Sequence, residues 1–254
     1  METPRLIGMT SRPRFSVVIP CYNEERYLTD ALLSLRKQDF DGEFEVVVVD
    51  NNCTDDTAGV ARDFGAVVVT EPTPGVCNAR QAGTLAARGE IVVSADADTV
   101  YERDWLSRID AGFRADERIV AVVGPCTYAD GPRWGRYFGR GLFGAVNAVY
   151  RVTGRAVYAS ATNIAFRRDA WTGYDTGLTQ GGDELDQLRR LRGKGRVVYD
   201  HANPTFTSGR RLARGFMYNV FVSLVVHYLL TYTVNRITGR RVFGQAPAFR
   251  EDFR

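Results

Sequence analysis

The sequence alternates short runs of β-branched residues with segments of helical periodicity, and no other feature limits its fold as much. Five apolar runs of strand length lie at residues 15–20, 44–50, 66–70, 90–95 and 119–124. Helical spacing of apolar residues, or capping residues typical of a helix start, marks the intervals at residues 24–37, 54–64, 75–88 and 103–114. Parallel strands need a crossover, which is usually a helix, so the alternation predicts an α/β fold with a mostly parallel central sheet.

The second half of the chain is less regular. Strands are predicted over residues 163–167 and 196–199, with a helix over residues 183–192 between them. A long apolar helix is predicted over residues 212–235. No internal repeat or linker divides the chain, so we expect a single domain followed by a C-terminal apolar helix.

Composition excludes several classes of protein. Lys and Arg total 33 against 30 for Asp and Glu, and this net charge of +3 is too balanced to indicate a nucleic-acid partner. Lys37 and Lys194 are the only lysines, and the chain has two histidines. A P-loop lysine, a Schiff-base lysine and a histidine-rich metal centre therefore have few candidates. The motif GxxxxGK[ST] does not occur, which disfavours P-loop nucleoside triphosphatases.

The cysteines and the N-terminal residues bear on location. Cys21, Cys53, Cys77 and Cys126 form no CxxC pair, and residues 1–14 lack the apolar run of a signal peptide. These features favour reduced thiols and a cytoplasmic location.

Carboxylates follow the predicted strands at the edge where parallel sheets bind ligands. Asp96 and Asp98 are two residues apart, so in an extended segment both side chains face the same way. A lone Asp-x-Asp is more often an acidic turn. Because Asp50 ends a neighbouring strand of the same sheet, we instead predict that Asp96 and Asp98 hold Mg²⁺ or Mn²⁺, which prefer oxygen ligands.

Two further residues at this edge are candidates for binding a nucleotide. Asp50 can accept hydrogen bonds from a base or a ribose, and the alternative is that it caps the next helix. Arg80 lies in the first turns of a predicted helix that opens at Gly75, where free N–H groups and a guanidinium suit a diphosphate. The alternative for Arg80 is a surface arginine.

A second acidic group lies at the start of the helix predicted over residues 183–192. Asp183, Glu184 and Asp186 suit the positive end of the helix dipole, so capping is one interpretation. The other is a general base, since a sugar hydroxyl that attacks an anomeric carbon must lose its proton. Because the chain has only two histidines, a carboxylate is the more available base.

Five segments, in order, resemble the family 2 glycosyltransferases. They are Val18–Glu24, Val49–Asp55, Asp96–Asp98, Asn163–Arg168 and Asp183–Glu184. The resemblance covers roughly residues 15–211. It implies the A-type glycosyltransferase fold, which is a Rossmann-like nucleotide-diphospho-sugar transferase domain. It also implies a nucleotide-sugar donor, a divalent metal ion and inversion at the anomeric carbon.

The resemblance also implies roles for residues that match the family pattern by position. Pro20, Tyr22 and Glu24 would line the nucleoside pocket with Asp50, and Asp96 would contact the donor as well as the metal. The family usually has Glu-Asp where this chain has Asp183-Glu184. Glu184 takes the position of the usual base, and Asp183 is the alternative.

Residues 208–211 resemble another family segment, in which arginines offset the charge of the leaving diphosphate. Arg210 and Arg211 are the candidates, and the alternative is a solvated basic run. With these residues included, the resemblance predicts a catalytic domain over residues 1–211. Its nucleotide half would be about residues 15–125 and its acceptor half about 126–211, followed by a helical appendage at 212–254.

The C-terminal apolar segment raises the question of a membrane. Polar residues recur every four positions at Asn219, Ser223, His227, Thr231 and Asn235, a stripe that a single lipid-facing span would not carry. Arg236, Arg240 and Arg241 follow, and residues 134–155 mix aromatic residues with arginines. We expect peripheral contact with the inner face of a membrane. Ordinary amphipathic packing helices are the alternative.

The sequence therefore predicts a metal-dependent inverting glycosyltransferase. It would move a sugar from a UDP- or GDP-linked donor to the hydroxyl of a glycan or lipid-linked acceptor, without a nucleic-acid partner. One alternative is a nucleotidyltransferase, although residues 15–24 lack the glycine-rich loop and phosphate-binding lysine that it would need. Another is a sugar-nucleotide-binding scaffold without turnover, which the Asp183-Glu184 departure favours.

Overall fold

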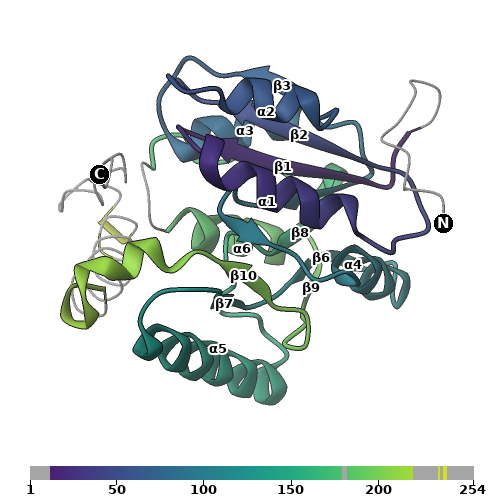
Figure 1. Ribbon diagram of the computed structural model, residues 1–254. Coiled ribbons are helices and arrows are strands. Elements are labelled where there is room, and N and C mark those ends of the chain that lie inside the picture. The colour runs from purple at the N-terminus through teal and green to yellow at the C-terminus, as the bar shows by residue number, and fades with distance from the viewer. Residues whose placement is uncertain (1–11, 179–181, 220–233, 235–236, 239–254) are drawn as a thin grey trace.

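Helices cover both faces of a central sheet in the computed structural model, which describes residues 12–178, 182–219, 234 and 237–238 (Figure 1). The strands are β1 (Phe15–Cys21), β2 (Phe44–Asp50), β3 (Val67–Thr70), β4 (Ile91–Ser94), β5 (Thr99–Val100), β6 (Ile119–Val123), β7 (Cys126–Tyr128), β8 (Ile164–Arg167), β9 (Arg196–Tyr199) and β10 (Thr205–Thr207). The α-helices are α1 (Glu25–Arg36), α2 (Thr57–Asp63), α3 (Val76–Ala86), α4 (Trp105–Arg114), α5 (Arg133–Thr153) and α6 (Asp183–Arg192). Two 3₁₀-helices are η1 (Arg168–Ala170) and η2 (Gly209–Arg214).

The central sheet has seven strands in the order β3-β2-β1-β4-β8-β6-β9. Neighbouring strands are parallel except at β8, which runs antiparallel to both β4 and β6. Because helices cover both faces, β1 and β2 are buried along nearly their whole length, which explains why both are mostly apolar. Their buried polar side chains, Ser16 and Glu45, form a hydrogen bond with each other at 2.6 Å. The predicted α/β fold with a mostly parallel sheet is confirmed.

The helices divide between the two faces of the sheet. One apolar cluster joins the sheet to α1 and α4 through side chains such as Leu28 and Trp105, and it also includes Ala61 of α2. The other joins the sheet to α3, α5 and α6, with Phe143 and Leu188 among its buried members. The alternation along the chain thus gives three layers.

A second sheet, which the sequence did not predict, connects distant parts of the chain. Its order is β5-β10-β7, and Phe206 of β10 lies opposite Val100 of β5 and Thr127 of β7. These strands have two or three residues each, too few to show a period of two in the sequence. The small sheet brings residues 205–207 beside the segment that follows Asp98.

Most predicted boundaries agree with the structure, and α6 and β9 have the predicted limits. The helix predicted from residue 54 begins instead at Thr57. Asp55 Oδ1 accepts hydrogen bonds from the Thr57 backbone N–H at 3.2 Å and the Thr57 hydroxyl at 2.5 Å. Asp55 therefore supplies a local contact at the start of α2.

The prediction that a long helix begins at Leu212 is wrong. Leu212 lies in the 3₁₀-helix η2, and Gly215 follows it with a φ of 85°, a left-handed conformation that ends the helix. Residues 220–233 lie outside the described residues, so the rest of the predicted C-terminal helix stays a prediction. Within the part of the chain that is described, no helix is both long enough and apolar enough to span a membrane. The division into domains at about residues 125 and 211 also stays a prediction.

Candidate active site

Carboxylates lie close together at the carboxyl ends of β1, β2 and β4, and these strand ends form the acidic edge of the sheet. Asp50 is the last residue of β2 and pairs with Cys21 at the end of β1, and Asp96 lies two residues beyond β4. The buried Cys21 thiol lies close enough to these carboxylates for their charges to affect its pKa. Burial raises its pKa most, and the negative charges of Glu24, Cys53, Asp96 and Asp50 raise it further. The structure thus brings three predicted donor-binding residues, Glu24, Asp50 and Asp96, to one edge.

Hydrogen bonds of the Asp50 and Asn51 side chains hold the loops at this edge. Asp50 Oδ1 accepts a hydrogen bond from the Cys53 N–H at 2.9 Å, so Asp50 orders its own loop rather than capping a helix. Asn51 Nδ2 donates to the carbonyls of Glu71 and Thr73, both at 2.7 Å, and its Oδ1 accepts from the Gly75 N–H at 2.9 Å. Asn51 therefore ties the end of β2 to the start of α3, a role that the sequence analysis missed.

Arg80 connects two acidic groups that lie far apart in the sequence. Its guanidinium donates to Asp96 Oδ1 at 2.7 Å and to Asp183 Oδ2, and the side chain is almost completely buried. Burial lowers the pKa of Arg80, but the charges of Asp96 and Asp183 outweigh it and raise the pKa on balance. The guanidinium is directed at carboxylates in this structure, and a contact with a donor diphosphate stays a prediction.

Asp183 and Glu184 are both buried in the first turn of α6, and their pKa values move in opposite directions. Burial raises the pKa of Asp183, but the Arg80 charge together with hydrogen bonds from Glu184, the backbone and Arg80 lowers the pKa on balance. Burial and then the Asp183 charge raise the pKa of Glu184 well above its usual range. Glu184 Oε1 accepts a hydrogen bond from the Tyr158 hydroxyl at 3.5 Å, whereas its buried Oε2 has no hydrogen-bond partner.

These opposite shifts separate the two candidates for a general base. Asp183 is held ionised in an ion pair, and its charge is committed to Arg80. Because the pKa of Glu184 is raised, its ionised form would be a stronger base than the ionised form of Asp183. The arrangement therefore favours Glu184. Tyr158, which no motif indicated, contacts this carboxylate from the segment after α5.

Arg210 connects a second pair of carboxylates at the same edge. Its guanidinium lies 2.5 Å from Glu24 Oε1 and 3.0 Å from Asp98 Oδ2, and it stacks over the Tyr27 ring at 4.6 Å. Asp98 also accepts a hydrogen bond from the Thr207 hydroxyl at 3.3 Å. The structure thus brings Arg210 to Glu24 and Asp98, and its predicted contact with a donor diphosphate stays a prediction.

The small sheet and a short turn place Arg210. The Ser208 N–H donates to the Asp98 carbonyl at 2.8 Å, and the Ser208 hydroxyl accepts from the Arg210 N–H at 3.3 Å. Asp130, just before α5, accepts hydrogen bonds from the Ser208 hydroxyl and the Gly209 N–H. The arginine is therefore positioned by contacts with three separate segments.

The remaining predicted residues occupy the same region. Pro20 lies in β1 opposite Val49, and the partly buried Tyr22 follows the end of that strand. Arg211 is exposed on η2, and its charge lowers the pKa of Glu24, although burial, the largest influence, raises that pKa on balance. Their roles in binding a donor stay predictions.

The acidic residues suit a cation that a diphosphate would help to bind. Among the described residues, no group of three or more His, Cys, Asp or Glu side chains could hold a metal ion. Mg²⁺ sites, however, usually use one or two carboxylates together with substrate phosphates. Asp96 and Asp98 supply two hard carboxylates, and both influence the Cys126 thiol, whose pKa rises to about 11 through burial and then their charges and that of Glu184. The chemistry of these two donors suits such an ion, and in this structure an arginine is paired with each of them.

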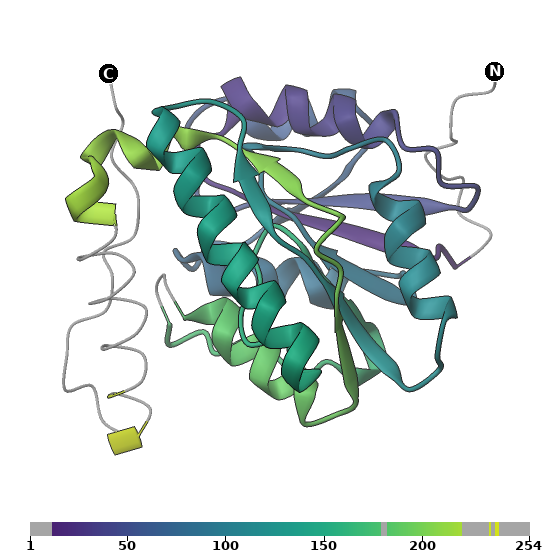
Figure 2. The ribbon, with the colours of Figure 1, turned by 90° about the horizontal axis from the view of Figure 1, so that it is seen from below.

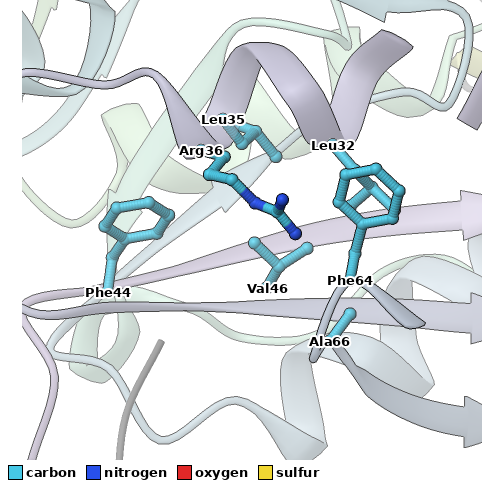
Figure 3. Close-up of a pocket in the computed structure, with 7 residues that line it drawn as sticks. All are labelled: Leu32, Leu35, Arg36, Phe44, Val46, Phe64 and Ala66. Atoms are coloured by element: carbon cyan, nitrogen blue, oxygen red, sulfur yellow. The ribbon is translucent and has the colours of Figure 1, made fainter. Parts of the chain in front are cut away.

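A small apolar pocket lies at the opposite edge of the sheet, beneath the C-terminal half of α1 (Figure 3). Figure 3 shows its lining side chains, with the Arg36 guanidinium stacked 4.6 Å from the centre of the Phe64 ring. Phe44, at the amino end of β2, also lines it. The pocket is therefore separate from the acidic edge.

The fold is shared with solved glycosyltransferases. A mannosyltransferase from Pyrobaculum calidifontis aligns with a TM-score of 0.65 and 23% identity over 94% of this chain and 67% of that chain. TarS residues 1–349 from Staphylococcus aureus align with a TM-score of 0.64 and 21% identity, over 87% of this chain and 68% of that chain. These similarities show that the chain has the A-type glycosyltransferase fold, as the sequence predicted.

Curated relatives cover a shorter region. An uncharacterized glycosyltransferase of Mycobacterium tuberculosis is 48% identical over 119 residues, which is 47% of this chain and 51% of that protein. The poly(ribitol-phosphate) beta-N-acetylglucosaminyltransferase TarS of Staphylococcus aureus is 36% identical over 119 residues, 43% of this chain and 20% of that protein. The chain thus spans about half the length of the mycobacterial relative, and less of TarS.

The family model of glycosyl transferase family 2 matches residues 16–172. The chain belongs to this family, and the resemblance found in the sequence is confirmed.

Proposed function

We propose that this chain is a metal-dependent inverting glycosyltransferase that moves a sugar from a nucleoside-diphosphate sugar to an acceptor hydroxyl. The observation that carries the proposal is the Arg80 bridge, which joins Asp96 at the sheet edge to Asp183 of α6. This bridge sets Glu184, a carboxylate with a raised pKa, beside the predicted donor site. A donor and a base would thus share one site.

Solved structures of the same fold support the class of donor. TarS has been crystallised with UDP-GlcNAc, and the Pyrobaculum calidifontis mannosyltransferase with GDP-Man and Mn²⁺. Glucosyl-3-phosphoglycerate synthase of Mycobacterium tuberculosis, with a TM-score of 0.58 and 22% identity, has been crystallised with Mn²⁺ and UDP-glucose. For this chain we propose a UDP- or GDP-linked sugar, bound along Pro20, Tyr22, Glu24 and Asp50.

In the proposed reaction, Glu184 accepts the proton of the acceptor hydroxyl. The oxygen of that hydroxyl attacks the anomeric carbon from the side opposite the diphosphate, which leaves with the electron pair of the broken C–O bond. Asp96 and Asp98 would hold Mg²⁺ or Mn²⁺, which would supply positive charge to the leaving diphosphate.

Arg210 and Arg211 add positive charge at the same place. Arg210 is paired with Glu24 and Asp98 through Nη2 in this structure. The bound ion and the guanidinium would both be attracted to Asp98. An ion that took Asp98 from Arg210 would leave the guanidinium available to the donor diphosphate. Binding of the ion and binding of the donor would therefore be coupled.

Ligand binding and turnover test this function separately. We expect UDP or GDP with Mn²⁺ to raise the melting temperature of the wild type, because a ligand that binds the folded state stabilises it. Asp98→Asn should abolish both the Mn²⁺-dependent shift and transfer, whereas Asp104→Asn, at the residue directly before α4, should change neither. Turnover by the wild type in excess chelator would contradict metal dependence, and binding without transfer to any acceptor or to water would favour the scaffold alternative.

A further inference from the structure

The outer face of α5 differs in charge from the rest of the molecule. Residues 131–168 contain seven arginines and no Asp, Glu or Lys, although the whole chain has nearly equal numbers of acidic and basic residues. Five of these arginines, Arg133, Arg136, Arg140, Arg151 and Arg155, are exposed on or just beyond α5. Figure 2 shows this helix running along the outside of the molecule.

The residues of α5 separate into three edges. Gly135, Gly139, Phe143 and Val146 are buried against the domain. At about 100° per residue, the four arginines within the helix fall on one exposed edge about 60° wide. This separation is that of a helix lying in an interface rather than of a helix with a uniformly solvated outer face.

The third edge, beside the arginines, is apolar and exposed. Tyr137 is 71% exposed, Val149 is 40% exposed and Val152 is 86% exposed, and the small residues between them add no polar side chain. Exposed apolar residues occur singly on most proteins, but here they follow one edge of one helix. A solvated helix face would not require this pattern.

The apolar edge continues onto the segment after η2. The rings of Trp134 and Phe216 meet edge to face with centres 5.3 Å apart, and Phe216 and Met217 are 46% and 66% exposed. In Figure 2 this segment lies beside the first turns of α5. Apolar side chains from two separate parts of the chain thus lie next to one line of arginines.

We propose that this face of α5, with Phe216 and Met217, docks on an anionic membrane surface. The arginines would lie among acidic headgroups, and Tyr137, Val152, Phe216 and Met217 would enter the boundary with the acyl chains. A nucleic acid would use the arginines but not the apolar edge. A second copy of this chain would bring arginines against arginines if it used the same face, so charge complementarity favours a membrane.

Contacts connect the docked face to the candidate active site. Asp130, which precedes α5, holds the turn that positions Arg210, and Phe143 of α5 stacks on Tyr158 with ring centres 5.7 Å apart. Tyr158 in turn contacts Glu184. Docking would therefore hold the base near the membrane, and, on the basis of the proposed function, this favours an acceptor whose hydroxyl is carried at the membrane surface.

Flotation of the full chain with vesicles tests the docking. We expect the wild type to bind vesicles of phosphatidylcholine with phosphatidylglycerol at low salt, and not vesicles of phosphatidylcholine alone. The triple variant Arg136→Gln, Arg140→Gln, Arg151→Gln should bind about hundredfold more weakly, because each arginine near such a surface contributes to attraction.

A matched control separates this face from the overall charge. Arg26→Gln, Arg62→Gln and Arg103→Gln remove the same charge from exposed positions on or beside α1, α2 and α4. This control should bind the anionic vesicles like the wild type. Equal weakening in both triple variants, or no weakening in the α5 variant, would overturn the proposal, as would failure of the wild type to float.

A double variant tests the apolar edge. Tyr137→Ser with Val152→Ser keeps every arginine and should weaken vesicle binding about tenfold. Unchanged vesicle binding would overturn the proposed insertion. If the wild type formed a dimer that this variant dissociates, and did not bind vesicles, the face would be assigned to contact with a second copy of the chain. The thermal shift with UDP or GDP and Mn²⁺ should be the same in all these variants, so loss of docking is distinguishable from failure of the proposed function.

Discussion

The two halves of the molecule place their functional side chains in different ways. In the half built from β1 to β4, Asp50 and Asp96 stand at the ends of strands whose positions the sheet fixes. In the second half, Arg210 lies on a 3₁₀-helix and is held by contacts with Glu24 and Asp98 of the first half. The first half therefore carries its part of the site within its own sheet, whereas the second half depends on contacts across the molecule.

The Arg80 bridge joins the two halves through a buried guanidinium, so its removal should have the largest effect. Arg80→Ala leaves Asp96 and Asp183 without their shared cation, and Asp183 is buried. We expect the free energy of unfolding to fall by about 3–5 kcal/mol, the usual cost of breaking a buried ion pair. Urea denaturation measures this, with Arg62→Ala as the control on an exposed arginine. A loss below about 1 kcal/mol would mean that the bridge contributes little.

The bases at the start of α6 can be distinguished by substitution. Glu184→Gln should lower kcat about 10²–10⁴-fold if Glu184 is the general base. Asp183→Asn removes the charge that raises the pKa of Glu184, so the acid limb of the pH–rate profile should move to lower pH. An unmoved limb, or a larger loss of kcat in Asp183→Asn with the fold intact by circular dichroism, would favour Asp183 as the base.

The raised pKa of Glu184 also has a consequence for stability. Because the folded state holds this proton more tightly than the unfolded state, its contribution to stability is complete below the ordinary glutamate pKa and is lost as pH rises through the folded value. Glu184→Gln should remove this decline. Urea midpoints measured at several pH values compare the two proteins.

The contact between Arg210 and Asp98 should give a smaller effect. Arg210→Ala frees Asp98 of its guanidinium, so Mn²⁺ should bind about tenfold more tightly in the absence of nucleotide, while UDP or GDP should bind more weakly. Electron paramagnetic resonance of free Mn²⁺ measures the first effect. Arg103→Ala, which removes the same charge elsewhere, should leave both affinities unchanged, and an unchanged Mn²⁺ affinity in Arg210→Ala would show that the two cations do not compete.

Tyr158→Phe should have the smallest effect. The hydrogen bond from Tyr158 to Glu184 is 3.5 Å long, at the limit for such a bond, so kcat should fall less than about threefold. The stacking of the ring on Phe143 would remain. A loss above about tenfold in steady-state turnover would show that Tyr158 orients the base.

The sequence predicted those parts of the structure that have a local signal. The mostly apolar runs of β1 and β2 and the acidic first turn of α6 are visible in the local sequence. The family motifs predicted Asp96, Asp98 and Glu184 as site residues, and their roles stay predictions. The partners of Arg80 had no such signal, since Asp183 is 103 residues away. The strands β5, β7 and β10 were missed because each has only two or three residues, too few to show the alternation of apolar and polar side chains that marks a strand.

The predicted start of the C-terminal helix is wrong for a physical reason. The apolar residues from Leu212 onward suggested one continuous helix, but Gly215 adopts a left-handed conformation that separates Leu212 from Phe216. A glycine within an apolar run is compatible with either outcome until tertiary contacts are known. Here Leu212 is buried, whereas Phe216 and Met217 are exposed.

The pairing of Arg210 with Glu24 joins residues 186 positions apart. During synthesis on the ribosome, β1 and Glu24, which follows it, emerge early. Arg210 emerges only when nearly the whole domain has left the exit tunnel. A nascent chain can therefore begin to order its parallel strands long before this ion pair exists. Prematurely terminated translation products would lack the pair, however well their first strands had formed.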